Sequence, residues 1–181
     1  MAEHTAGEYR IRAATPGDVP AMVRMRLALQ DHMAARTRSL WGMSEKRVAN
    51  LPRRYRERIA DQAECVLVVD HLPSGAPVGM GSAAIHHHDD YAPAQSGGIE
   101  DVWIDPEHRG KGLCRALFLR LLAFFEEQGV TDLLLRYADG NEEAKTVWTH
   151  YGFRPTLITA TACLGDVEAA IHGQQRGENA L

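Results

Sequence analysis

The chain has 181 residues, of which 45% are hydrophobic and 24% charged, and its formal net charge is -4 with nine histidines counted as neutral. This length suits one globular domain with a buried core and leaves no room for a second full domain. The acidic balance argues against a general nucleic-acid binder, which normally carries a strongly basic face, and weakly favours a cationic small-molecule partner.

The cysteines indicate neither a disulfide framework nor a zinc knuckle. Cys65, Cys114 and Cys163 stand far apart and form no Cys-x-x-Cys pair, so a reducing cytoplasm is the simplest location. The N-terminus lacks a basic region followed by an apolar run, and no stretch approaches the roughly 18 apolar residues that span a bilayer. We therefore expect a cytoplasmic protein with no membrane segment and no removed leader.

The first half of the chain predicts strands and helices in turn. Alternation indicates a strand over 9–13, and Thr15-Pro16-Gly17-Asp18 has the pattern of a helix start near Pro16. A second helix, rich in arginine, is expected over about 44–61. An apolar run over 65–69, a turn at 73–75 and a strand over 78–85 then predict a hairpin.

The second half continues the alternation of strands and helices. A strand over 99–104 is followed by an apolar helix over 113–128, which Gly129 ends. Next come a strand over 132–137, a helix capped by Asn141, and a last strand over about 156–164. We expect one domain over 9–172, with flexible termini at 1–8 and 173–181.

The segment after the strand over 99–104 is the most informative part of the chain. It runs through Asp105-Pro106 into a basic, glycine-bearing loop and directly into a helix. Such a helix start presents unpaired N–H groups and a positive dipole end to an anion, and the two glycines allow a pyrophosphate to approach the main chain. The P-loop and dinucleotide patterns fit worse, while an ordinary strand-to-helix connection stays open at this point. The loop residues are His108-Arg109-Gly110-Lys111-Gly112-Leu113-Cys114.

Two motifs resemble those of the GNAT superfamily of N-acetyltransferases. The first, at 109–114, is similar to the acetyl-CoA motif Gln/Arg-x-x-Gly-x-Gly/Ala: Arg109 and Gly112 match, and Cys114 replaces the last small residue. The second resembles Asn-x-x-Ala followed by an aromatic residue and Gly-Phe, and runs from Asn141 to Phe153. The order of strands and helices from about 9 to 164 also resembles the family, so the likeness covers nearly the whole chain.

This resemblance implies the fold and the cofactor. It implies an α/β fold of the α+β type, with a mixed, mostly antiparallel central sheet of six to seven strands, about four flanking helices and a V-shaped cofactor cleft. It also implies acetyl-CoA as co-substrate, without a metal. The residues implied to bind it are Val102, Trp103, Ile104, Arg109, Gly110, Lys111, Gly112, Leu113, Cys114, Asn141 and Trp148.

The chemistry needs a base for the substrate ammonium, donors for the thioester oxygen and a way for the thiolate to leave. Glu100 is the candidate base, because family members place a carboxylate just before the cofactor-binding stretch. Strand alternation sends Asp101, its nearest competitor, to the opposite face. Trp148 stands where many members carry an acidic tyrosine, so the general acid stays unassigned, with Tyr151 and Tyr137 as substitutes.

The acceptor site is the least defined part of the sequence. Trp41, His88, Asp89 and Asp101 are the candidate substrate residues. A metal site at 86–90 is less favoured than a solvated strand end, since alternation divides its histidines between two faces. The arginine run at 53–58 is interpreted as a solvated helix face rather than a contact to an acidic partner.

Three functions remain open. The first is transfer of an acetyl group to the primary amine of a small molecule, in a ternary complex. The others are N-acetylation of a protein or peptide, and acyl-CoA sensing without turnover. The amine, the acyl chain length and the oligomeric state, a homodimer included, stay open.

Overall fold

The computed structural model describes residues 4–36, 42–90 and 92–178, and the chain divides into two units, 1–141 and 142–181. The division falls inside the segment 9–172 that the sequence predicts to be one domain. The first unit holds the whole sheet and three α-helices, and the second holds two α-helices. Each unit is described by itself below.

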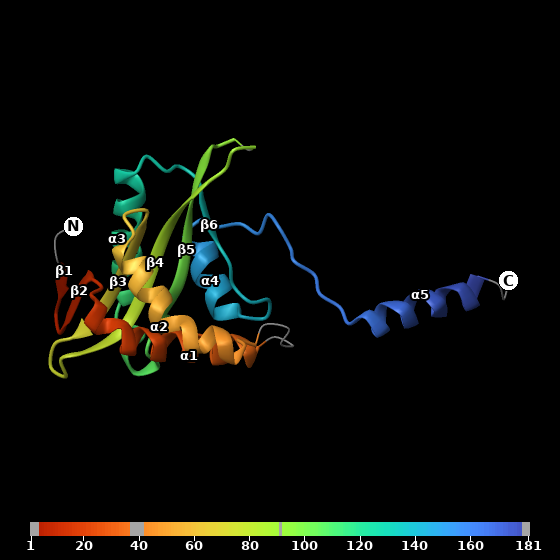
Figure 1. Ribbon diagram of the computed structural model, residues 1–181, viewed down its shortest axis with the longest axis horizontal. Helices are drawn as coiled ribbons and strands as arrows, with labels where there is room; N and C mark the ends of the chain where they lie inside the picture. The colour runs from red at the N-terminus through yellow and green to blue at the C-terminus, as the bar shows by residue number, and fades with distance from the viewer. Residues whose placement is uncertain (1–3, 37–41, 91, 179–181) are drawn as a thin grey trace. The chain divides into compact units, whose positions relative to one another are not determined.

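The first unit is built on a mixed sheet, shown in Figure 1. Its strands follow chain order, all neighbours are antiparallel except the parallel last pair, and the bounds are β1 (His4–Ala6), β2 (Tyr9–Ala13), β3 (Glu64–His71), β4 (Ala76–His87), β5 (Gln95–Ile104) and β6 (Leu133–Leu135). Within the described residues, β2 to β6 form a five-stranded sheet, which the three-residue β1 extends at one edge. The strand expected over 156–164 is not part of this sheet.

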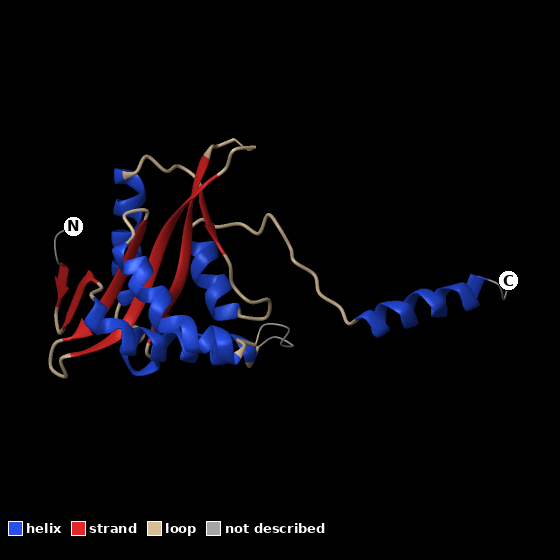
Figure 2. Cartoon of the chain, viewed as in Figure 1, coloured by secondary structure: helices blue, strands red, loops and turns tan. Residues whose placement is uncertain are grey.

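The described residues form five α-helices, against the expected number of about four (Figure 2). Their bounds are α1 (Val19–Ala34), α2 (Glu45–Ala60), α3 (Leu113–Glu127), α4 (Glu142–His150) and α5 (Leu164–Glu178). Two short 3-10 turns, η1 (Pro16–Asp18) and η2 (Pro106–His108), precede α1 and the loop before α3. The predicted starts near Pro16 and Ser44 are confirmed, and Ser44 accepts a hydrogen bond from the Arg47 N–H.

The two faces of the sheet carry different helices, because alternate side chains of a strand point to opposite sides. Met80 packs with Met22 and Met25 of α1 and with Tyr55 of α2. The next residue, Gly81, faces α3: a Cβ added there would lie 2.8 Å from the Leu117 side chain. The first unit is therefore a three-layer structure, with α1 and α2 on one face and α3 on the other.

The second unit differs most from the sequence expectation. The predicted strand over 156–164 is absent: 153–163 has no regular structure, and Leu157 and Ile158 are 91% and 89% exposed. Threonine and isoleucine suit a strand, but a strand also needs a hydrogen-bonded neighbour, which these residues lack in the described chain. A helix that the sequence did not predict, α5, follows instead. Its backbone includes 173–178, which lies in the segment expected to be a flexible terminus, just as β1 lies in the other.

Candidate functional site

The loop between β5 and α3 has the geometry of an anion site. Gly110 and Gly112 have φ of 73° and 74°, a left-handed conformation that a residue with a Cβ adopts only at a cost. Apart from each glycine and its two chain neighbours, no described heavy atom lies within 4 Å of where either Cβ would be, so the main chain there is open to an approaching group. Gly112 is the N-cap of α3 and supplies no side-chain cap, which leaves the positive end of the helix dipole to a ligand.

The two cations of this loop are anchored to the sheet. The Nε of Arg109 donates to the carbonyl oxygen of Ile104 at 3.0 Å, and its guanidinium lies 4.9 Å from the centre of the Trp103 ring. Lys111 Nζ donates to the Tyr9 hydroxyl at 2.7 Å. The Tyr9 hydroxyl is also hydrogen-bonded to His108 Nδ1 at 2.9 Å. The loop is therefore held at both ends by β5 and β2.

Strand β5 offers its backbone beside this loop. Its register with β6 ends at the pair Ile99–Leu135, so within the described chain 100–104 has no strand neighbour on that side. The Trp103 side chain faces α1, where its ring centre lies 5.6 Å from that of His32. Ile104 is buried and Val102 half-buried. This half of β5 can therefore bind an extended ligand through main-chain groups, as an edge strand binds a peptide.

A bulge in β5 corrects the prediction that Glu100 and Asp101 point to opposite faces. The register with β4 shifts between Met80 and Ser82, and Asp101 has φ of 53°. Aspartate is one of the few residues that tolerate this region. As a result both carboxylates reach one guanidinium: Glu100 lies 3.2 Å from Arg58 Nη2 and Asp101 3.1 Å from Arg58 Nη1.

The two carboxylates differ in their surroundings. Asp101 is 17% exposed and contacts three groups: Arg58, the Tyr55 hydroxyl at 2.9 Å and Arg26 Nε at 3.1 Å. Glu100 is 49% exposed and, among the described residues, forms an ion pair with Arg58 alone. Asp101 is therefore fixed as part of the bulge, while the carboxylate of Glu100 stays accessible to a substrate.

The charged and polar groups of this cluster shift one another's pKa values. Burial raises the pKa of Tyr55 well above its usual value, and the neighbouring Asp101 carboxylate raises it further, so Tyr55 stays a neutral donor. Burial disfavours the charged form of Arg58, but its hydrogen bond with Glu64 and the charges of Glu64, Asp101 and Glu100 outweigh burial and raise the pKa. Arg58 is thus a permanent cation shared among three carboxylates.

A pocket of about 410 Å³ opens beside Glu100. Its walls come from α2, the segment between α2 and β3, and the strands β3, β4 and β5. The lining residues are Arg53, Arg54, Glu57, Arg58, Asp61, Glu64, Ala84, His86 and Glu100. This pocket is a concave site on the first unit with room for a small molecule.

The structure places the predicted substrate residues unevenly. His86 lines the pocket, but His88 and Asp89 do not. His88 instead forms a hydrogen bond with Ser96 at 2.8 Å, and Asp89 is exposed in the bend after β4. Trp41 lies outside the described residues. Among those residues no group of three His, Cys, Asp or Glu side chains is placed to hold a metal ion.

Two cofactor candidates lie at the division between the units. Asn141 is the last residue of the first unit, and Trp148 belongs to α4 in the second. Within that unit the Trp148 ring packs against Tyr151 and Phe153, at 6.2 and 6.1 Å between ring centres.

Sequence reasoning missed the residues that support the site. Arg26, Tyr55 and Arg58 come from two helices, and no short motif joins them to β5. The arginine-rich pattern of α2 was visible, but only packing against the sheet shows which arginines face the bulge.

An open strand edge beside an uncapped, glycine-bearing helix start can accommodate an extended ligand that ends in an anion. The sequence matches the acetyltransferase (GNAT) family over residues 28–153. The chain therefore belongs to this family, which confirms the resemblance of its motifs.

Individual relatives agree with this assignment. Glucosamine 6-phosphate N-acetyltransferase of Trypanosoma brucei brucei is 33% identical over 84 residues, which are 46% of this chain and 55% of that protein. The match thus spans about half the length of that relative. An acetyltransferase from Clostridium acetobutylicum, crystallised with acetyl-CoA, is 16% identical with a TM-score of 0.69, and the match covers 87% of this chain and 97% of its own.

A plant enzyme has the same fold. Glucosamine-6-phosphate N-acetyltransferase from Arabidopsis thaliana is 19% identical with a TM-score of 0.64, and the match covers 86% of this chain and 98% of its own. At these identities the two structures establish the fold. No helix in the described part of the chain is long and apolar enough to cross a bilayer.

Proposed function

We propose that this protein transfers the acetyl group of acetyl-CoA to the primary amine of a small molecule, by direct transfer in a ternary complex. The observation that carries the proposal is the open half of β5, which leads from the glycine loop before α3 to the accessible carboxylate of Glu100. The glycine conformations, the uncapped helix start and the nearby cations fit a pyrophosphate, and the strand edge fits the pantetheine arm.

The residues of this chain would divide the chemistry among them. Bound acetyl-CoA supplies a thioester that an uncharged amine attacks. Glu100 would take the proton of the substrate ammonium, and main-chain N–H groups near Val102 and Trp103 would donate to the thioester oxygen. No side-chain acid is needed at the leaving sulfur, because the thiolate of a thiol whose pKa is about 8.5 is already a fair leaving group.

The acceptor is a small molecule rather than a peptide in this proposal. The pocket beside Glu100, about 410 Å³, falls in the range of small-molecule sites, roughly 300–1,000 Å³. The trypanosomal and plant relatives are named for acetylating an amino sugar phosphate, which supports the same class. We place the reaction in the cytoplasm, a reducing compartment that would keep Cys65, Cys114 and Cys163 as thiols.

Thermal unfolding with acetyl-CoA tests the cofactor site. Ligand at a hundredfold over its dissociation constant should stabilise the wild type by about 2.7 kcal/mol. The variant Arg109→Ala/Gly112→Asp should lose this shift, and Arg56→Ala, on the exposed part of α2, should keep it. Equal shifts in all three proteins, or a response to NAD or ATP alone, would overturn the proposal. Thiol release with a panel of amines then separates an enzyme from an acyl-CoA sensor.

A further inference from the structure

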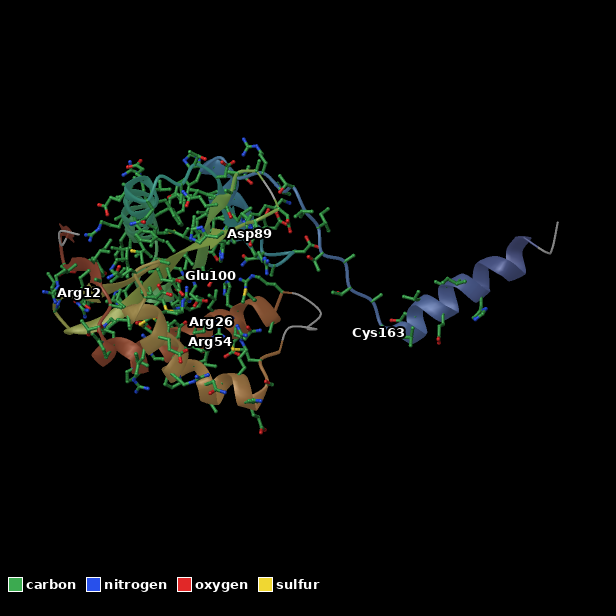
Figure 3. The ribbon with its side chains drawn as sticks, turned by 45° about the horizontal axis from the view of Figure 1, so that its top comes forward. Arg12, Arg26, Arg54, Asp89, Glu100 and Cys163 are labelled. Atoms are coloured by element: carbon green, nitrogen blue, oxygen red, sulfur yellow. The ribbon has the colours of Figure 1, made fainter. Side chains whose placement is uncertain are left out.

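The pocket beside Glu100 is lined by charges of both signs. Its α2 wall carries Arg53 and Arg54 together with Glu57, while Asp61 and Glu64 follow next along the chain and Glu100 lies on the β5 wall. Figure 3 labels Arg54 and Glu100, one from each wall. A ligand that contacts both the arginine pair and Glu100 needs a negative and a positive charge, and a primary amine supplies only the positive one.

The arginines of the α2 wall differ in how far their charges are already used. Arg58, at the base, is 12% exposed and is shared among Glu64, Glu100 and Asp101. Arg53 pairs with Glu57, but both side chains are more than half exposed, and such pairs contribute little. Arg54 makes no hydrogen bond or ion pair with any described residue. Arg53 and Arg54 are therefore available to a ligand.

A second hollow extends this positive wall along α2. It measures about 340 Å³, shares Arg53 and Arg54 with the pocket, and is lined also by Ser44, Lys46, Arg47 and Asn50. The described residues that line it include four cations and no carboxylate. The positive charge increases from Glu100 outward along the helix, which is the arrangement that orients a bipolar substrate.

We propose that the physiological acceptor carries an anionic group, phosphate or carboxylate, that Arg53 and Arg54 bind while its amine lies at Glu100. Guanidinium groups bind both anions through two parallel N–H donors, so they also fix the direction of the substrate. The inference rests on the proposed acetyl transfer and narrows its substrate class. From the sequence alone, the arginine run is interpreted as a solvated helix face. That interpretation predicts that an anionic group on the amine has no effect on kcat/KM, whereas the present inference predicts an increase.

Matched pairs of amines test the inference in the full-length protein. Glucosamine is compared with glucosamine 6-phosphate, and butylamine with 5-aminopentanoate, by thiol release at saturating acetyl-CoA. In the wild type, kcat/KM should be at least about tenfold higher for one anionic member than for its neutral partner, as expected for a charge-assisted hydrogen bond. The phosphate and carboxylate pairs show which anion the site prefers.

The variant Arg54→Gln should remove that preference by lowering kcat/KM for the anionic amine about tenfold, while the neutral partner changes less than twofold. Arg56→Gln is the matched control, since it lies on the same helix, loses the same charge and lines neither hollow. Equal effects of Arg54→Gln on both members of each pair, or no effect on either, would overturn the inference and leave the proposed acetyl transfer standing.

A lack of turnover with all four amines would overturn the proposed function instead, and binding then decides the inference. Calorimetric titration of glucosamine 6-phosphate and of 5-aminopentanoate into the protein with CoA should detect an interaction that Arg54→Gln weakens and Arg56→Gln does not. Binding that is equal in the two variants, or undetectable in the wild type, would overturn the inference as well.

Discussion

Glu100 and Asp101 are neighbours in the sequence, yet their carboxylates have different surroundings. Asp101 contacts two arginines and a tyrosine in a half-buried cluster, and Glu100 is half exposed at the pocket. A base must reach the proton it removes, and it must be free to change its protonation state. By both criteria Glu100 suits the proposed proton transfer better than Asp101.

The variant Glu100→Gln should keep the fold and the affinity for acetyl-CoA while kcat falls by about 10²–10⁴-fold, the usual contribution of a general base. The rise of kcat with pH that proton removal by a carboxylate produces should disappear with it. Steady-state kinetics across a pH series measures both effects. Glu127→Gln, an exposed carboxylate at the C-terminal end of α3, is the control, and an equal loss there would show that Glu100 has no special role.

Among the elements, the turn η1 before α1 is held in place by the ion pair between Asp18 and Arg12. Asp18 accepts hydrogen bonds from both terminal nitrogens of Arg12, at 2.8 and 2.9 Å, and from the Thr15 N–H and hydroxyl. Burial alone would raise the pKa of Asp18, but the bonds from Arg12 and Thr15 outweigh it and lower the pKa from 3.8 to about 2. The folded state therefore favours the ionised form.

This pKa shift predicts a pH-dependent contribution to stability. A lowered pKa stabilises the fold fully above the ordinary value of 3.8, and the contribution is lost as pH falls towards about 2. Asp18→Asn should lower the free energy of unfolding near neutral pH by about 2 kcal/mol, with a smaller difference below about pH 4. Denaturant unfolding across pH measures this, with the exposed Asp31→Asn as control. A difference that does not change with pH would contradict the linkage.

The elements that sequence reasoning placed correctly are those with local signals. Helix α3 has an apolar periodicity and ends at Gly129, whose φ is 67°. The hairpin of β3 and β4 follows from two apolar runs and a turn. The bulge at Asp101 was missed because strict alternation was assumed, and the strand over 156–164 was wrong because composition cannot show whether a pairing neighbour exists. The same holds for the candidate site. Its loop has a local sequence signal and was predicted, whereas Arg26, Tyr55 and Arg58 reach β5 only through tertiary packing and were not predicted.

At the scale of the whole molecule, ligand binding should slow amide hydrogen exchange in the open half of β5. Bound acetyl-CoA should raise the hydrogen-exchange protection of amides in 100–104 and at the start of α3 at least about tenfold, because these groups would then have partners. Amides of β2, which pairs on both sides, should change little. Exchange followed by mass spectrometry measures the difference, and uniform protection of all strands would speak against a local site.

The two units differ in how far they bury their apolar side chains. Its helix α5 exposes Leu164, Val167 and Ile171, which are spaced along one face of the helix. The first unit, by contrast, buries the aliphatic residues of β3 and β4 between helix layers. The stability of the sheet and its pocket is therefore expected to come from the packing of α1, α2 and α3.

The open half of β5 also exposes the protein to misassembly. An unpaired strand edge can pair with a strand of another molecule and begin an aggregate. The bulge at Asp101 interrupts the regular spacing of main-chain groups, and the Glu100 carboxylate stands at the same place. A strand from another molecule would therefore lose its register after a few residues. A short ligand arm needs only a few main-chain hydrogen bonds and is not affected. The same irregularity would thus leave the edge open to the proposed cofactor arm while limiting long pairing with another molecule.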